Sequence, residues 1–418
     1  MKSGADGPSL RTRFELFMVG ELDAEVRRSM LIDLSAAGVR SVMTAIIAFI
    51  PLILKRSGAS TEQIAYYYAI TVGGLVTLGI SVRLMRRWGM KRVSMICWVL
   101  GRGVLLLTAL AFDARHLVTN LLMIFTVFWL LEAWTAPAYN QTMQTIYPAR
   151  QRGRILAAVR VGLVALTLVF TPLAGWILDH LGFRVLLPLV GVFGIGSTLI
   201  FFPLLRKIPE PVAGPSRPPV SAWQILKTDQ RMPFYLGGIL LFGLGTLISA
   251  PLYPAIQVER LNLSYTAMGQ LGFVQSTFWL LGCLFGGRIL DRLGGLRSLQ
   301  IVFLINIFVM LPYIWATQGW MLWPSFVAAG LVTAGTDLAI LYTVIQLAGA
   351  QSVPEYSFLN ATVYGFRGLL GPLLGSLLVR AGLPFGLIFG LSACLTFSAA
   401  GILILAARAK APILPSQA

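Results

Sequence analysis

Long apolar runs alternate with short polar turns along the whole chain. A helix needs about 20 mostly apolar residues to cross a bilayer, and twelve runs satisfy this length. They lie near residues 34–54, 63–83, 93–112, 117–139, 155–178, 184–205, 233–256, 265–287, 299–316, 320–347, 356–379 and 384–407. The pattern predicts an all-α membrane protein with twelve transmembrane helices.

The longest connection between apolar runs covers residues 206–231 and contains five prolines, which interrupt the helical pattern. It divides the runs into two groups of six. We therefore expect a cytoplasmic N-terminal segment (1–32), a first six-helix bundle (33–205), a cytoplasmic linker (206–231), a second six-helix bundle (232–408) and a cytoplasmic tail (409–418).

Composition supports lipid as the main solvent, because 57% of the residues are hydrophobic and only 12% are charged. The formal net charge of +17 raises the question of nucleic acid. Lys and Arg, however, occur mostly in short groups between apolar runs, as in the loops of helical membrane proteins. We expect contact with a lipid bilayer and no nucleic-acid partner.

The distribution of basic residues also predicts the orientation, since cytoplasmic loops are enriched in Lys and Arg. If both chain ends lie in the cytoplasm, 23 of the 33 basic residues fall on that side and only six on the other. Residues 1–31 offer no apolar core like that of a signal peptide. We expect a multi-pass protein of the cell (inner) membrane with both termini cytoplasmic.

Enzymatic or metal chemistry has few candidate residues. The three cysteines, Cys97, Cys283 and Cys394, lie far apart within apolar runs, and the two histidines, His116 and His180, lie in predicted loops. This spacing suits neither a zinc site nor a catalytic triad. No nucleotide motif indicates direct use of ATP. We expect no enzyme activity and no cofactor.

The loop that follows the eighth apolar run reads GRILDRLGGLR and places Gly287, Asp291, Arg292, Gly294 and Arg297 at fixed spacing. A shift of 205 residues aligns it with the loop after the second run. There, Arg87, Gly89 and Arg92 match, while Arg86 stands where Asp291 would be expected. The motif resembles the loop motif of the major facilitator superfamily.

A second internal correspondence supports the repeat. Residues 171–183 (TPLAGWILDHLGF) align with residues 371–383 (GPLLGSLLVRAGL) at a shift of 200, which pairs Pro172 with Pro372 and Gly175 with Gly375. The resemblance implies two pseudo-symmetric six-helix bundles that open alternately to each face of the membrane. In this family the loop motif is thought to favour one of the alternating states through a charge cluster. The alternative is that its charges are solvated and only set the topology.

Six charged residues lie inside predicted spans, away from their end residues, where each costs at least about 2.5–3.5 kcal/mol unless it finds a partner or a cavity. The acids are Glu132 and Asp337, and the shift of 205 that aligns the loops also aligns these two positions. The bases are Arg40, Arg102, Arg160 and Arg367.

Two interpretations of the acids remain open. If Glu132 and Asp337 face a central polar cavity, desolvation favours their protonated forms and couples protons to solute movement. If they form salt bridges with the arginines, they stay ionised and structural.

The arginines exceed the acids by two, which favours an anionic solute, with the deeper Arg102 and Arg367 as the candidates to bind it. Arg40 and Arg160, nearer the ends, could instead extend toward the surface. Trp129 and Tyr139 share a helical stripe with Glu132 and are further candidates for solute contact, although helix packing explains the aromatics equally well.

These patterns together predict a secondary active transporter of a small solute that works by alternating access, as a monomer in the bilayer. Proton-coupled export of organic or drug-like compounds is the first expectation. Import of an organic anion is the alternative, and a membrane sensor or receptor that keeps a transporter scaffold without translocation is another.

Overall fold

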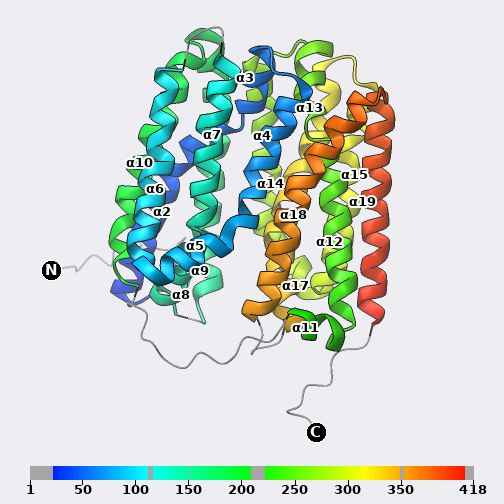
Figure 1. The fold of residues 1–418 in the computed structure, drawn as a ribbon. Coiled ribbons are helices and arrows are strands. Elements are labelled where there is room, and N and C mark those ends of the chain that lie inside the picture. The colour runs from blue at the N-terminus through cyan, green and yellow to red at the C-terminus, as the bar shows by residue number, and fades with distance from the viewer. Residues whose placement is uncertain (1–21, 112–115, 149, 209–221, 349–352, 410–418) are drawn as a thin grey trace, which may run out of the picture.

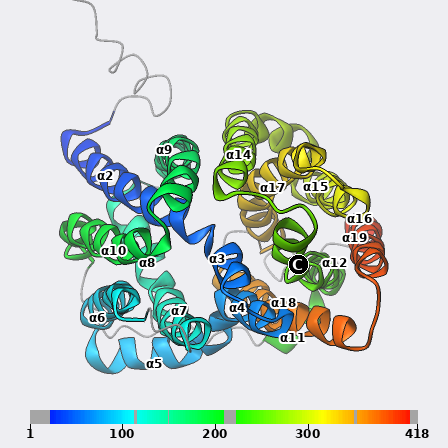
Figure 2. The same cartoon turned by 90° about the horizontal axis from the view of Figure 1, so that it is seen from above.

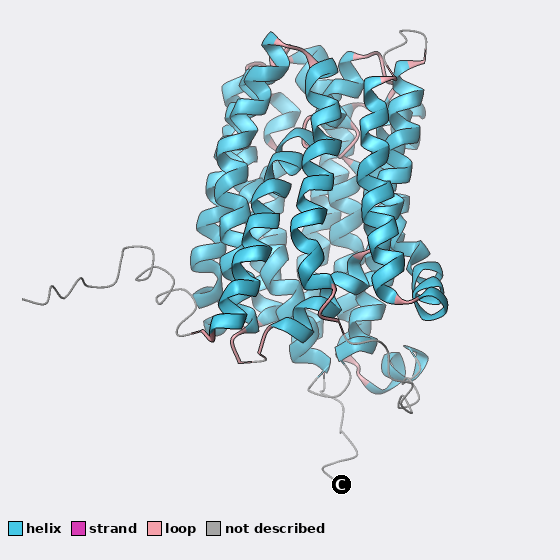
Figure 3. Ribbon diagram, turned by 90° about the vertical axis from the view of Figure 1, so that its left-hand side faces the viewer, coloured by secondary structure: helices cyan, strands magenta, loops and turns pink. Residues whose placement is uncertain are grey.

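The structure is a computed structural model that describes residues 22–111, 116–148, 150–208, 222–348 and 353–409. Within these ranges the chain is helical, and no strand is present (Figure 3). Twelve helical segments in them are long and apolar enough to cross a membrane. The prediction of an all-α membrane protein with twelve transmembrane helices is confirmed.

The first half contains six spanning segments, several of which are interrupted. Their helices are α2 (Ala24–Ile47), α3 (Ile50–Arg56), α4 (Thr61–Gly73), η1 (Gly74–Thr77), α5 (Leu78–Trp88), α6 (Met90–Gly103), η2 (Val104–Ala109), α7 (Leu117–Trp134), α8 (Ala136–Ile146), α9 (Arg152–His180) and α10 (Phe183–Leu205).

The second half repeats the arrangement after the short helix α11 (Ala222–Thr228). Its helices are α12 (Arg231–Ile248), α13 (Leu252–Ala255), η3 (Ile256–Arg260), α14 (Tyr265–Leu293), α15 (Gly295–Met310), α16 (Pro312–Trp315), η4 (Gly319–Leu322), α17 (Trp323–Ala348), α18 (Val353–Arg380) and α19 (Phe385–Arg408).

The two halves stand side by side as separate helix bundles (Figures 1 and 2). The lower end, as drawn in Figure 1, is the one where α2 begins and α19 ends, and the upper end is the one where α3 ends and α14 begins. Two helix pairs make the most extensive contacts between the bundles, because α14 packs against α9 and α18 packs against α4.

Left-handed glycines mark the repeat at the points that the sequence aligned. Gly89 and Gly294 each end one helix and precede the next, with φ of 86° and 76°. Gly182 and Gly382, which are 200 residues apart, have φ of 76° and 80°. Residues with a Cβ rarely adopt this conformation, so glycine is the residue that these turns require.

Proline interrupts the first spanning segment of each half in the same way. Pro51 follows a break at residues 48 and 49, and Pro251 follows a break at residues 249 and 250. Proline lacks the N–H that would continue the helical ladder, so the segment bends there. The two prolines are again 200 residues apart.

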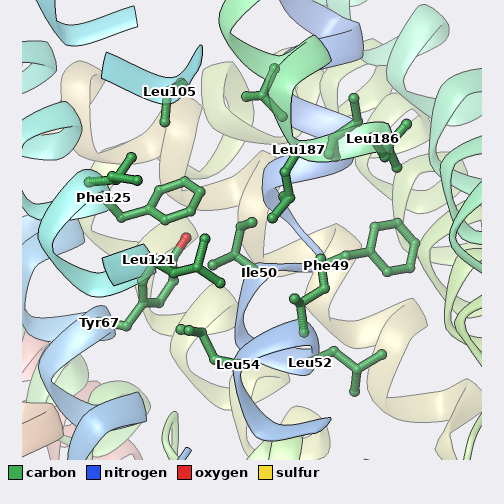
Figure 4. Packing of buried hydrophobic residues seen from close by; sticks show 14 of the residues in the cluster. Phe49, Ile50, Leu52, Leu54, Tyr67, Leu105, Leu121, Phe125, Leu186 and Leu187 are labelled. Carbon is green, nitrogen blue, oxygen red and sulfur yellow. The ribbon is translucent and has the colours of Figure 1, made fainter. Parts of the chain in front are cut away.

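Each bundle has its own apolar core. In the first bundle, aromatic and aliphatic side chains from all six spanning segments interlock, including Ile50, Leu54, Tyr67, Leu105 and Phe125, all 3% exposed or less (Figure 4). The second bundle buries an equivalent set around Phe242, Phe303 and Leu403. The first core also takes in Tyr265 of α14, so the bundles pack against each other where α14 begins.

Some boundaries differ from the sequence-based expectation. Helix α2 begins at Ala24, ten residues before the apolar run that predicted it, so the spanning segment includes Asp33. Part of the linker, residues 222–228, is helical, while residues 209–221 lie outside the described ranges. The proposed division into segments 1–32, 33–205, 206–231, 232–408 and 409–418 stays a prediction.

Candidate functional site

Arg102 on α6 and Glu132 on α7 form an ion pair inside the first bundle. Arg102 Nη2 lies 2.9 Å from Glu132 Oε1, and its Nε donates to the other carboxylate oxygen at 3.3 Å. Its remaining nitrogen, Nη1, donates to the Gly194 carbonyl and to the hydroxyls of Ser197 and Thr198 on α10. Arg102 is only 4% exposed, so its charge is buried and fully bonded.

Asp337 on α17 pairs instead with an arginine of the opposite bundle. Arg160 Nη2, on α9, lies 3.4 Å from Asp337 Oδ2. The Arg160 side chain is 44% exposed, against 4% for Arg102, so the basic member of this pair is far more accessible. The two acids are similarly exposed, at 27% for Asp337 and 21% for Glu132. The Arg160 guanidinium also lies over the Trp279 ring of α14, 5.9 Å from its centroid.

The two acids therefore occupy equivalent places in the repeat but differ in their surroundings. Glu132 is tied to its own bundle by two hydrogen bonds from Arg102, whereas Asp337 reaches across the boundary between the bundles. Arg160 contacts Asp337 and the Trp279 ring across this boundary, although its side chain is partly exposed. Both acids thus lie in ion pairs with arginines, as the structural interpretation expects. A proton-coupling role for either acid stays a prediction.

Arg367 on α18 lies inside the second bundle, 5% exposed. It donates to the Ile239 carbonyl of α12 at 2.8 Å, and its guanidinium lies 3.6 Å from the Tyr364 ring centroid. No acid lies within ion-pair distance of it among the described residues. Both Arg102 and Arg367 are thus too enclosed to meet a solute in this conformation, and solute binding by them stays a prediction.

Trp129 and Tyr139 pack in different clusters of the first bundle, on either side of an interruption of the helix at Thr135, between α7 and α8. Pro137, at the second position of α8, lacks the N–H that the ladder would use. Trp129 packs beside Phe128 in the core of the first bundle, whereas Tyr139 stacks on Phe201. Their role in solute contact stays a prediction.

Asp33, the most buried acid of α2, is a polar residue that the hydrophobic pattern does not place in a span. Its side chain accepts a hydrogen bond from the Tyr147 hydroxyl at 3.0 Å, and the residue is 3% exposed. A cavity of about 30 Å³ beside it is lined also by Arg40, Arg102 and Tyr139. Asp33 lies just before the apolar run at 34–54, but the helix begins earlier, at Ala24, and so includes it.

A second group that the sequence did not reveal joins the two bundles at the upper end, and we call it the upper latch. It consists of Lys55 and Arg56 on α3, Asp179 on α9, and Glu259, Leu263, Tyr265 and Thr266 of the second bundle.

Asp179 is the centre of this latch. Its two carboxylate oxygens accept hydrogen bonds from the backbone N–H groups of Tyr265 and Thr266, at 3.0 and 2.7 Å. These are the first N–H groups of α14, which have no partner inside the helix, and a helix N-terminus attracts negative charge. Asp179 therefore caps a helix of the opposite bundle.

Basic residues of α3 complete the latch. Arg56 donates to the Leu263 carbonyl and lies over the Tyr265 ring, 4.0 Å from its centroid, and Lys55 pairs with Glu259. The upper ends of the bundles are thus held together in this conformation.

The loop motif at the lower end shows no comparable contact. Asp291, Arg292 and Arg297 are exposed, and within the described ranges no ion pair joins Asp291 to an arginine. Gly294 supplies the left-handed turn, while a Cβ at Gly287 would meet open space. A role of the motif in the alternation, with Arg87, Gly89 and Arg92 of the first half, stays a prediction.

In the described ranges, no three His, Cys, Asp or Glu side chains gather as they would around a metal ion. The charged contacts are ion pairs and helix caps. They suit the attraction of a charged solute or the control of a conformational change.

Comparison with known proteins gives one consistent family. The family model described as Major Facilitator Superfamily matches residues 32–372. Human monocarboxylate transporter 11 is 27% identical over 338 residues, which cover 77% of this chain and 69% of the relative.

Two solved structures share the fold. A variant of the nucleoside transporter NupG superimposes with a TM-score of 0.63 at 13% identity, covering 90% of this chain and 99% of the other. A bacterial homologue of the human lysosomal transporter Spinster, in an inward-facing and unoccupied conformation, gives a TM-score of 0.62 at 14% identity, covering 93% and 96%. Each of these named proteins is a transporter.

Proposed function

This chain belongs to the major facilitator superfamily and is a multi-pass membrane transporter of a solute, and from that premise we propose that it carries a small organic anion together with a proton. The proposal rests on one observation, the accessible ion pair between Arg160 and Asp337 at the boundary of the two bundles. The similarity to a monocarboxylate transporter supports the choice of an anion.

The chemistry follows from the charge balance of this pair. In the empty protein, Asp337 neutralises Arg160. A carboxylate solute that binds the Arg160 guanidinium replaces Asp337 as its partner through charge-assisted hydrogen bonds. Asp337 is then left ionised in a poorly solvated place, which is unfavourable, so it takes up a proton. Anion and proton cross together without net charge.

The position of this pair between the two bundles is compatible with transport by alternating access. Each bundle contributes one member of the pair, so relative movement of the bundles changes the environment of both side chains. The upper latch closes one side of the boundary in the present conformation. By the excess of Lys and Arg in the loops of the lower end, we propose that the lower end faces the cytoplasm.

The pair between Arg102 and Glu132 has a different role in this proposal. It lies within one bundle and is bonded on every side, so it holds α6, α7 and α10 together while the bundles move. Export of drug-like compounds is the first expectation from the sequence and stays a prediction. The ion pair between Arg160 and Asp337 adds no support to it.

Counterflow in proteoliposomes tests the solute class. Vesicles preloaded with unlabelled lactate or benzoate should accumulate the labelled anion in a saturable way, which a sensor without translocation would not do. Arg160→Gln should reduce kcat/KM for the anion at least about tenfold, the loss expected when a charged hydrogen bond of about 1.5–3 kcal/mol is removed. Arg40→Gln, which removes a cation outside the pair, is the control. Saturable counterflow that is unchanged in Arg160→Gln would contradict the proposal.

A further inference from the structure

An apolar groove of about 320 Å³ runs along the second bundle, lined by α14, α15 and α17. Helices α14 and α15 lie at the outer edge of this bundle (Figure 2). On α17 the groove is lined by Leu338 and Ala339, whereas the neighbouring Asp337 pairs with Arg160 of the opposite bundle. The groove therefore faces the surrounding bilayer and not the boundary between the bundles.

Glycines bring the three helices of the groove close together. A Cβ at Gly282 of α14 would clash with Ala334 of α17, and one at Gly335 of α17 would clash with Val302 of α15. No charged side chain lines the groove among the described residues. Such a surface favours contact with an apolar chain.

The length of the groove matches one leaflet of a bilayer. Its α14 wall runs from Phe278 to Leu290, which is roughly 18 Å at 1.5 Å per residue. The hydrocarbon of one leaflet is roughly 15 Å thick, half of the core of a typical bilayer. Because α14 ends at Leu293 at the lower end, the groove suits an acyl chain of the leaflet on that side.

Two arginines continue the walls of the groove toward the lower end. Arg292 follows Ile289 by three residues on α14, and Arg297 precedes Ile301 by four on α15, so each lies on the same stripe as a residue of the wall. Both are exposed and form no ion pair within the described ranges. Asp291, two residues after Ile289, lies on another face of α14. Two guanidinium groups together favour a phosphate.

A buried hydroxyl lies between the arginines and the apolar part of the groove. Ser298 lines the groove directly after Arg297 and is 6% exposed. Its Oγ has no hydrogen-bond partner among the described residues. An unpaired buried hydroxyl is unfavourable, and an acceptor oxygen of a ligand would remove that cost. In a phospholipid, ester oxygens occupy this level, between the phosphate and the acyl chain.

The first half of the repeat offers a matched comparison. Its second spanning segment is interrupted at η1, between α4 and α5, where α14 is continuous. Arg87 and Arg92 nevertheless hold the loop positions that correspond to Arg292 and Arg297. Both are exposed as well. The arginine pairs thus differ in the helices above them and not in their charge.

We propose that the groove is a binding site for one anionic phospholipid of the leaflet at the lower end. One acyl chain lies along the groove, the phosphate binds Arg292 and Arg297, and an ester oxygen accepts a hydrogen bond from Ser298. The site goes beyond the proposed function, because it involves neither Arg160 nor Asp337. Since α14 also packs against α9, the lipid stabilises a helix of the boundary.

Native mass spectrometry of the purified protein, titrated in detergent with lipids of equal chain length, tests the site. The first molecule of phosphatidylglycerol should bind at least about tenfold more tightly than phosphatidylcholine, whose phosphate already has an ammonium partner. Glycerol 3-phosphate, which has the phosphate without the chains, should not displace phosphatidylglycerol at equal concentration. Displacement would assign the site to a free phosphate and not to a lipid.

Substitution of the arginines separates the groove from general surface charge. Arg292→Gln with Arg297→Gln should lower the affinity for phosphatidylglycerol to that for phosphatidylcholine. Arg87→Gln with Arg92→Gln is the control and should change it by less than about twofold, because exposed charges away from the lipid contribute little. The same loss in both double variants would overturn the proposal.

Two further variants test the chain and the ester. Gly286→Leu places a side chain in the groove and should weaken both lipids, and Ser298→Ala should weaken both about threefold through the lost hydrogen bond. Unchanged binding in both variants, equal affinity for the two lipids, or a dimer that excludes lipid would overturn the proposal. Elution and melting profiles like those of the unsubstituted protein verify folding, and Ser298→Ala gives a second reading if Gly286→Leu does not fold.

Discussion

Arg160 and Asp337 meet 3.4 Å apart across the boundary between the two bundles, one side chain from each half of the repeat. Glu132, the repeat equivalent of Asp337, is bonded to Arg102 within a single bundle. The two acids are therefore equivalent in the sequence repeat, but their ion-pair partners lie in different places. One ion pair crosses the boundary between the bundles, and the other lies within the first bundle.

The enclosed pair should contribute more to stability than the boundary pair. We expect Glu132→Gln to lower the free energy of unfolding by about 3 kcal/mol, because it leaves the buried Arg102 charge without its partner. Asp337→Asn should cost clearly less, since Arg160 is 44% exposed and can be solvated. Thermal unfolding in detergent, compared at one lipid and salt concentration, measures both. Equal losses would show that the two pairs have the same environment.

The upper latch should control access from the upper side. Asp179→Asn removes the charge that caps α14 and weakens two hydrogen bonds, so the latch should open more often. In a variant without native cysteines, Ala329→Cys on α17, which lines a cavity of about 310 Å³ between the bundles, reports opening by its rate of reaction with a membrane-impermeant maleimide. We expect this rate to rise about tenfold, which corresponds to about 1.4 kcal/mol.

Glu62→Gln is the matched control for the latch. Glu62 lies near Arg380 at the same end, but at 3.9 Å and with both side chains largely exposed. Its loss should leave the labelling rate within about twofold, because exposed pairs contribute little. A labelling rate in Asp179→Asn no higher than that in Glu62→Gln would exclude the latch as the closing contact.

The glycines of the loop motif should differ sharply in their tolerance of alanine. Gly294→Ala places a Cβ at a φ of 76°, which should cost about 1 kcal/mol. Gly89→Ala should cost about the same, because Gly89 has the same conformation at the equivalent turn. Gly287→Ala should be neutral or slightly stabilising, since it lies within α14 with open space around it. Melting temperatures of the three variants measure the difference, and a destabilising Gly287→Ala would contradict this reading.

The fold was predictable because its signals are local. Twelve apolar runs of spanning length suffice to predict twelve helices, and the left-handed glycines fall where the two internal shifts aligned them. The start of α2 was missed, because the helix continues through polar residues that a hydrophobic pattern does not detect. Asp33 was overlooked for the same reason.

The pairing of charges was less predictable, because it depends on how helices from different halves pack. Nothing near Arg160 in the sequence indicates that α9 packs against α14 and that the Arg160 side chain reaches Asp337 of α17, and its position near a helix end favours the surface instead. Asp179 lies in the segment that aligned the repeats, yet its partner is the backbone of α14, which has no sequence signature. Equivalence of Glu132 and Asp337 in the repeat did not predict that their partners would differ.

The most direct test of the central claim is pH-driven uptake of labelled lactate into proteoliposomes that contain Asp337→Asn. Because the asparagine cannot take up a proton, we expect exchange of lactate to continue while the accumulation driven by a pH gradient falls to the level seen without the gradient. Glu132→Gln, if folded, should keep its response to the gradient. Accumulation by Asp337→Asn equal to that of the unsubstituted protein would contradict the account.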